Sequence, residues 1–461
     1  MELKNLHDIF LSCGRVSTDS RTLTGGELFF ALRGGNFDGN EYAVKALEAG
    51  ASYAVVSESF SGEVPEAYRG RLIRVPDTLE ALQALARYHR STAFVSGKPL
   101  PVVGLTGTSG KTTTKELIRA VLSVRYEVTA TEGNLNNSIG VPLTLLRITP
   151  QTQIAVVEMG ASHPGDIKEL TSVALPTYGL ITNVGKAHLL GFGSFEGVMK
   201  TKGELYDYLQ RTADKAFLDM DNPYLRAMAS ERPDLLTIPY GLSFQNAEVL
   251  DTDENHPYLR MRFISDAGSK VELDTQLMGA YNASNVMAAI AVGKEFGVSL
   301  EEAVSAISAY VPSNSRSHLV RTGRNTLIVD VYNANPSSMN AALDNLEDMK
   351  ARHKAVMLGD MLELGEDSLK EHSEIVRRVR SMGVEAFFVG SEFGRALAAS
   401  DVLCGNAEVN ASPDAAGECA IRHFSSSDDL AAWLAANPSE GRTVLVKGSR
   451  GMRMEKVVPQ L

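Results

Sequence analysis

At 461 residues, the chain is too long for one hydrophobic core and predicts about three domains. Its apolar fraction of 44% and charged fraction of 22% are typical of a globular protein, and the net charge of -11 argues against general nucleic-acid binding. The charged start of the chain, the lack of a bilayer-length apolar stretch and three cysteines without CxxC spacing predict a cytoplasmic protein with no membrane insertion. We also expect a monomer.

The first region, residues 1–98, has the pattern of a small α/β unit. Short apolar runs predict strands near residues 27–32 and 52–56, and an amphipathic stretch predicts a helix over residues 78–89. Residues 96–99 read Ser-Gly-Lys-Pro, a composition that favours a linker at the end of this region.

The second region, residues 99–312, alternates strand-like and helix-like segments, which predicts a mostly parallel sheet. Its predicted strands cover residues 101–105, 153–158, 178–182 and 216–219. The segment 247–277 alternates as antiparallel strands do, and a helix is predicted from residue 283. Parallel sheets of this kind bind ligands at the carboxyl ends of their strands.

The third region, residues 313–461, repeats the strand-then-helix pattern and predicts a second doubly wound, Rossmann-like α/β domain. Its predicted strands cover residues 326–331, 355–358, 386–389 and 443–446, and its helices include 337–349 and 428–436.

The run GTSGKTT follows the strand at 101–105 and opens into a helix, an arrangement that cradles phosphates. Lys111 would reach the outer phosphates, and the Thr112 hydroxyl could bind Mg²⁺. The common pattern has a glycine where Leu105 stands, so this loop is a shortened variant; a plain Gly/Ser/Thr turn is the alternative. The other residues of the predicted nucleotide loop are Gly107, Thr108, Ser109, Gly110 and Thr113.

Other polar residues follow predicted strands. Glu158 could hold Mg²⁺ or be an exposed strand-end acid, and His188 could bind metal or be structural. By itself, Lys202 reads as a solvated surface lysine. Asp330 could accept a hydrogen bond from a ribose hydroxyl. The amide-rich loop 134–137 could present donors to a polar ligand or form an ordinary turn.

In their order along the chain, these motifs resemble the Mur ligase family, the ATP-dependent amide-bond-forming enzymes of peptidoglycan precursor synthesis. The resemblance covers all three regions, and it is strongest to the D-alanyl-D-alanine-adding branch. The runs that carry it are STDSR from Ser17, ELFFALRG from Glu27, GTSGKTTTKE from Gly107, GNLNNSIGVPLTLL from Gly133, VEMGASHPGDI from Val157, TNVGKAHL from Thr182, KGEL from Lys202, GAYNASNVMAAIA from Gly279, YNANPSSM from Tyr332, LGDMLELGE from Leu358 and VLVKGSRGMRMEKVV from Val444.

The resemblance implies three domains: a uridine-nucleotide-binding domain (1–98), an ATP-binding domain (99–312) and a C-terminal ligase domain (313–461). It implies that Lys202 is carbamylated and, with Glu158 and His188, holds a second Mg²⁺, while Lys111 and Thr112 serve the ATP phosphates and the first Mg²⁺. The remaining implied contacts are Asn282 and Asn285 to adenine, Arg316 and Asp330 to phosphate and ribose, Ser20 and Arg21 to the uridine nucleotide, Asn136 to the muramoyl peptide, and Tyr332, Asn333 and Asn335 to substrate.

The implied reaction joins D-alanyl-D-alanine to UDP-N-acetylmuramoyl-tripeptide through an acyl phosphate, with ATP as the third substrate and no nucleic-acid partner. The third residue of the tripeptide, L-Lys or diaminopimelate, stays open. Three alternatives also stay open: a folylpolyglutamate synthase or another Mur ligase, a nucleotide-switch or motor ATPase, and a non-catalytic UDP-sugar-binding protein.

Overall fold

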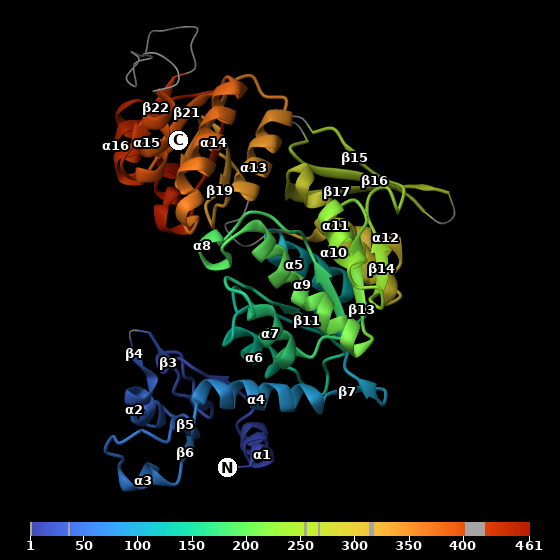
Figure 1. The fold of residues 1–461 in the computed structure, drawn as a ribbon, viewed down its shortest axis with the longest axis vertical. Coiled ribbons are helices and arrows are strands. Elements are labelled where there is room, and N and C mark those ends of the chain that lie inside the picture. The colour runs from blue at the N-terminus through green and yellow to red at the C-terminus, as the bar shows by residue number, and fades with distance from the viewer. Residues whose placement is uncertain (1, 36, 253–255, 266–267, 313–317, 402–419) are drawn as a thin grey trace.

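Three α/β bodies follow one another along the long axis of the molecule, each built on its own sheet (Figure 1). In this computed structural model, the described residues are 2–35, 37–252, 256–265, 268–312, 318–401 and 420–461. The parallel sheets confirm the predicted three-part α/β class. Within the described residues, no helix is both long and apolar enough to cross a bilayer.

The first body has a parallel sheet of order β1-β2-β5-β6. Its strands are β1 (Val16–Ser17), β2 (Leu28–Phe30), β5 (Tyr53–Ser57) and β6 (Leu72–Val75), with the short ribbon β3 (Arg33–Gly34) and β4 (Phe37–Asp38). Its helices are α1 (Leu3–Cys13), α2 (Ala43–Glu48), α3 (Glu66–Arg69), α4 (Thr78–Ser91) and the 3₁₀ turn η1 (Gly39–Tyr42). The predicted linker is a tight antiparallel hairpin of β7 (Phe94–Val95) and β8 (Lys98–Pro99).

Helix α4 fastens the first body to the second. It packs against helices α6 and α7 of the central body, which it underlies in Figure 1. Gln83 Nε2 donates to Ser138 O at 3.2 Å and to Glu169 Oε1 at 2.8 Å, and His89 Nε2 donates to Ile148 O at 2.8 Å. These hydrogen bonds and the helix packing join the first body to the central one through α4.

The central body has a parallel sheet of order β10-β11-β9-β12-β13-β14, covered by helices, and a separate antiparallel sheet β15-β16-β17. Its strands are β9 (Val102–Thr106), β10 (Val128–Ala130), β11 (Ile154–Glu158), β12 (Tyr178–Ile181), β13 (Lys215–Asp219), β14 (Leu236–Tyr240), β15 (Ala247–Leu250), β16 (Tyr258–Ile264) and β17 (Lys270–Met278). Its helices are α5 (Lys111–Leu122), α6 (Gly140–Leu145), α7 (Asp166–Ala174), α8 (Leu189–Phe192), α9 (Phe195–Thr212), α10 (Pro223–Ser230), α11 (Ala283–Glu295), α12 (Leu300–Ala309) and η2 (Ala280–Asn282).

The C-terminal body has a sheet of order β18-β19-β23-β20-β21-β22, parallel except for β18. Its strands are β18 (His318–Arg321), β19 (Thr326–Asp330), β20 (Lys354–Gly359), β21 (Glu385–Val389), β22 (Ile421–Phe424) and β23 (Thr443–Lys447). Its helices are α13 (Pro336–Asp348), α14 (Ser368–Met382), α15 (Ser391–Asp401), α16 (Ser427–Ala436), η3 (Gly365–Asp367), η4 (Arg450–Met452) and η5 (Met454–Gln460).

Candidate active site

The sheet topology of the central body gathers the predicted site. Strand β9 lies between β11 and β12, with Glu158 opposite Leu105 and Ile181 opposite Thr106. The segments that leave the carboxyl ends of these three adjacent strands must therefore lie side by side. They are the nucleotide loop after β9, Glu158 and its following loop, and the loop after β12 that leads to His188.

The nucleotide loop has the geometry that its two glycines permit. Gly107 has φ +146° and Gly110 has φ +79°, conformations that L side chains rarely adopt, and a Cβ on Gly110 would meet Asn285 Oδ1 at 2.7 Å. Ser109 N donates to Asn183 Oδ1 at 3.0 Å, which ties the loop to the segment after β12. The Lys111 Nζ folds back over the loop and donates to Gly107 O at 2.8 Å.

Thr112, Glu158 and Asn136 meet behind this loop. Thr112 Oγ1 donates to the two carboxylate oxygens of Glu158 at 2.9 and 3.2 Å, and Asn136 Nδ2 donates to Oε1 at 2.8 Å. Glu158 is only 1% exposed, so the alternative of an exposed strand-end acid is wrong. A buried carboxylate beside a threonine hydroxyl is a donor set of hard oxygens, which Mg²⁺ prefers.

Lys202 is buried on α9 at 2% exposure, so the alternative of a solvated surface lysine is also wrong. Its Nζ lies over the Phe192 ring, 5.5 Å from the centroid, and among the described residues no carboxylate lies within ion-pair distance of it. Burial, and then the charge on Lys111, lower the pKa of Lys202 well below its usual range. A lowered pKa favours the uncharged amine, the form that reacts with carbon dioxide.

His188 stands at the start of α8 in the left-handed conformation, with φ 49°. Its Nδ1 lies 2.5 Å from Glu363 Oε2 of the C-terminal body. Burial is the largest influence on the pKa of His188 and lowers it; the charges on Lys111 and Lys202 lower it further, while Glu363 raises it. The ring is thus kept neutral, as a metal ligand must be.

These residues fit a divalent metal once Lys202 carries a carboxylate. Nowhere in the described part of the chain do three or more His, Cys, Asp or Glu side chains gather in a metal-binding group. If Glu158 and His188 hold a metal, a carbamylated Lys202 would add a third ligand.

Asn282 and Asn285, expected to face adenine, make a buried chain of hydrogen bonds. Asn285 Nδ2 donates to Asn282 Oδ1 at 2.8 Å, and its own Oδ1 accepts from Thr114 Oγ1 at 2.9 Å. Both asparagines also line a cavity of about 580 Å³ together with Tyr281. The structure gives them a clear role in bracing the helix that follows the nucleotide loop.

The C-terminal residues meet through sheet register, because Asp330 on β19 lies opposite Lys447 on β23. Lys447 Nζ donates to Asp330 Oδ2 at 2.6 Å and to Asn333 O at 3.0 Å. Asn335 caps α13 by accepting from Ser338 N at 2.9 Å. Local spacing did not single out Lys447; the signal available was a lysine at the end of an apolar strand.

Three adjoining cavities share His188. A cavity of about 390 Å³ is lined by residues of the central body, and a cavity of about 580 Å³ lies between the central and C-terminal bodies. Lys111 and Asn136 line both. A third, of about 120 Å³, is lined by Asn333, Glu363 and Arg450. The larger cavity contains the nucleotide loop with Asp330, Tyr332, Asn333 and Asn335.

Two predicted sites lie apart from this centre. Ser20 and Arg21 stand in the turn after β1 of the first body, where Arg21 is exposed and its Nη2 pairs with Asp19 Oδ2 at 2.7 Å. Arg316 lies outside the described residues.

Replacing Lys447 with methionine is expected to lower the free energy of unfolding of the C-terminal body by about 3 kcal/mol, because the Asp330 carboxylate then has no lysine to pair with. The Lys447 side chain is 1% exposed and the Asp330 side chain is 14% exposed. Because Asp330 retains some contact with solvent, the expected loss of stability is at the lower end of the range for a broken buried ion pair. Urea unfolding followed by fluorescence measures this, because Trp433 is the single tryptophan and packs on Phe387 in this body.

The matched control is the double variant Asp330→Asn with Lys447→Met, which removes both charges and should recover most of the loss. An unchanged midpoint in the single variant would contradict the role assigned to this pair.

Comparison with known proteins gives one consistent match. Residues 14–90 match the Mur ligase family, catalytic domain; residues 105–293 match the Mur ligase middle domain; residues 315–450 match the Mur ligase, glutamate ligase domain. The chain is 34% identical to UDP-N-acetylmuramoyl-tripeptide–D-alanyl-D-alanine ligase of Bacillus subtilis, over 97% of this chain and 92% of that protein.

Solved structures agree. A crystal structure of MurF from Acinetobacter baumannii superposes with a TM-score of 0.83 at 26% identity, covering 100% of this chain and 98% of the other. MurF ligase from Thermotoga maritima in complex with ADP superposes with a TM-score of 0.79 at 25% identity, covering 97% and 96%.

Proposed function

Because this chain belongs to the Mur ligase family, we infer that it is an ATP-dependent ligase that joins D-alanyl-D-alanine to UDP-N-acetylmuramoyl-tripeptide. The product is the pentapeptide precursor of peptidoglycan. One structural observation carries the inference: two cavities meet at Lys111 and His188. One is lined in part by Ser138 and Glu169, which accept hydrogen bonds from Gln83 of the first body, and the other reaches the C-terminal body. A donor from one side and a nucleotide from the other would come together there.

The reaction has two steps. The tripeptide carboxylate attacks the γ-phosphate of ATP, which forms an acyl phosphate and releases ADP. The amine of D-alanyl-D-alanine then attacks the acyl carbon, and phosphate leaves as the amide forms. The first step brings two anions together, so Lys111 and the N–H groups of the nucleotide loop supply the positive field that it needs.

The proposed residue roles follow from the contacts above. Thr112, which donates to Glu158, would serve one Mg²⁺ at the ATP phosphates. Glu158, His188 and a carbamylated Lys202 would hold a second. When bound, Mg²⁺ supplies charge neutralisation at the phosphates. The burial and the lowered pKa of Lys202 support carbamylation. The amide of Asn136 supports a contact to the donor beside Glu158. Asn282 and Asn285 are proposed for adenine, Asp330 for ribose, and Tyr332, Asn333 and Asn335 for substrate, since all six line the larger cavity.

The first body is proposed to bind the uridine nucleotide through Ser20 and Arg21, with domain limits near residues 98 and 312. The free Cys13 thiol supports a cytoplasmic location. A monomer remains our prediction, which light scattering coupled to gel filtration measures directly.

The activity assay is phosphate release with UDP-N-acetylmuramoyl-tripeptide, with and without D-alanyl-D-alanine, followed by the mass of the product. Rapid release is expected only with both substrates, with a product heavier by one dipeptide less water. D-glutamate, L-glutamate, L-lysine and diaminopimelate serve as matched acceptors and should give no product. Phosphate release that needs no acceptor would favour a nucleotide switch, and preference for glutamate would favour a folylpolyglutamate synthase.

A further inference from the structure

The loop from Asp360 to Asp367, here called the docking loop, crosses from the C-terminal body to the central body. It joins β20 to α14, and its turn η3 contacts α8. Glu363 Oε2 lies 2.5 Å from His188 Nδ1, and the Glu363 carbonyl accepts from Leu190 N at 3.3 Å. One residue of this loop therefore meets both the ring of His188 and the backbone just after it.

The chemistry of this contact fixes the state of the His188 ring. An ionised carboxylate can only accept a hydrogen bond, so Nδ1 must carry the hydrogen. The lone pair of the neutral ring is then on Nε2. A histidine that binds metal through one nitrogen usually donates the other N–H to a carboxylate or carbonyl, which sets its tautomer and orientation.

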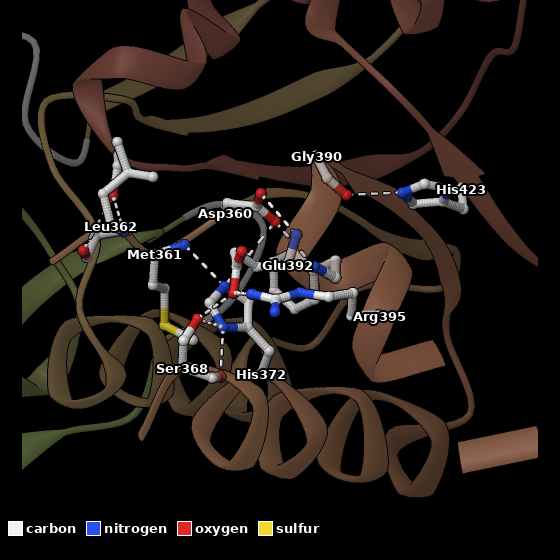
Figure 2. Close-up of polar contacts among 12 residues, drawn as sticks. Asp360, Met361, Leu362, Ser368, His372, Gly390, Glu392, Arg395 and His423 are labelled. Atoms are coloured by element: carbon white, nitrogen blue, oxygen red, sulfur yellow. Dashed lines mark hydrogen bonds and ion pairs between the residues drawn. The ribbon is translucent and has the colours of Figure 1, made fainter. Parts of the chain in front are cut away.

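Contacts within the C-terminal body hold the docking loop (Figure 2). At its start, Asp360 accepts from Glu392 N at 3.0 Å and from Phe393 N at 2.9 Å. Next to it, Met361 N donates to Nε2 of the fully buried His372 at 3.0 Å, while His372 Nδ1 donates to Ser368 O at 2.7 Å.

Beyond Met361, Leu362 N donates to Ser449 Oγ at 2.9 Å. Glu363 then adopts φ +65°, a left-handed conformation that a non-glycine residue holds only where its surroundings fix it. The C-terminal body thus holds the backbone that leads to Glu363, and the Glu363 carboxylate reaches from it to His188.

We propose that Glu363 is a positioning residue that completes the second metal site from the C-terminal body. It accepts the Nδ1 hydrogen of His188 and so presents Nε2 as the ligand when this body docks on the central one. The site is then fully oriented only in the docked arrangement, which couples domain position to metal binding. This inference rests on the proposed role of His188 as a metal ligand.

A second contact lets the role of Glu363 be separated from docking itself. Lys186 Nζ pairs with Glu371 Oε1 at 2.6 Å, and Lys186 N donates to Ser337 Oγ at 3.1 Å. Glu371 is 4% exposed at its side chain and precedes His372 on α14. These contacts join the two bodies without Glu363, so a Glu363 variant should stay docked.

The test uses the full chain with ¹⁵N-labelled histidine. In metal-free wild type we expect His188 to carry its hydrogen on Nδ1; a His188→Gln spectrum assigns its signals among the nine histidines. In Glu363→Ala the hydrogen should move wholly or partly to Nε2. With ADP bound, the Mn²⁺ affinity of Glu363→Ala at the second site should be about 10- to 100-fold lower than that of wild type. The affinity of Glu363→Gln should lie between those of wild type and Glu363→Ala.

Glu366→Ala is the matched control, because Glu366 is, like Glu363, an exposed glutamate of the docking loop. This variant should change neither the tautomer of His188 nor the Mn²⁺ affinity. An unchanged tautomer and unchanged Mn²⁺ affinity in Glu363→Ala would overturn the inference, as would equal effects in both variants. Failure of the proposed function is separate, because wild type would then make no pentapeptide whatever the tautomer of His188.

Discussion

Replacing Lys111 with alanine is expected to reduce ATP-dependent ligation on the order of 10³-fold. The Lys111 ammonium is held over the nucleotide loop by the Gly107 and Thr108 carbonyls, at 2.8 and 3.3 Å, where both large cavities meet. The step in which the donor carboxylate approaches the γ-phosphate depends most on this charge. ADP release at saturating substrates measures the effect.

The fall should appear in kcat, because the charge is needed most in the transition state. Arg119→Ala is the control: it removes a positive charge from the exposed side of the same helix, α5, and should leave kcat unchanged. If Lys111→Ala kept more than about a tenth of the wild-type kcat, Lys111 would not stabilise the transition state, and the loop would serve only to bind the nucleotide.

The second large effect is expected for Lys202→Ala, which should lose on the order of 10²-fold or more in activity and regain part of it with short carboxylic acids. The side chain is buried with a pKa well below its usual range, so the neutral amine is suited to forming a carbamate. Its removal leaves a pocket beside the Phe192 ring, where formate or acetate could place a carboxylate in its stead. Initial rates against added acid measure the rescue.

Lys200→Ala provides the comparison, because Lys200 is an exposed lysine on the same helix, two positions away. It should have wild-type rates with or without added acid. If Lys202→Ala were fully active and its rate did not change with added carboxylic acid, the proposed role of Lys202 as a metal ligand would be wrong.

Sequence patterns best predict features that depend on residues close together in the chain. The strand, glycine turn and helix around Lys111 follow one another directly, so spacing was enough to place the nucleotide loop. Glu158 was placed correctly because carboxyl ends of adjacent parallel strands share an edge, and Thr112 lies on the next segment of that edge. The burial of Lys202 was not readable from its polar neighbours, and only the resemblance to a family drew attention to it.

What the sequence left out are contacts between distant segments. Glu363 and His188 are 175 positions apart and meet only because two bodies dock. Asp330 and Lys447 are 117 positions apart and meet through a strand register that no short pattern reports. The run around Glu363 was noticed as a family signature, yet nothing in its spacing said which residue it would touch.

The long helix α4 has a consequence for substrate choice. Its hydrogen bonds through Gln83 and His89 join the first body to the central one. If the first body binds the uridine nucleotide as proposed, α4 sets the distance from that nucleotide to Lys111. We then expect a donor whose peptide is one residue shorter to place its carboxylate short of the γ-phosphate, so that donor length is selected by the spacing of the first two bodies.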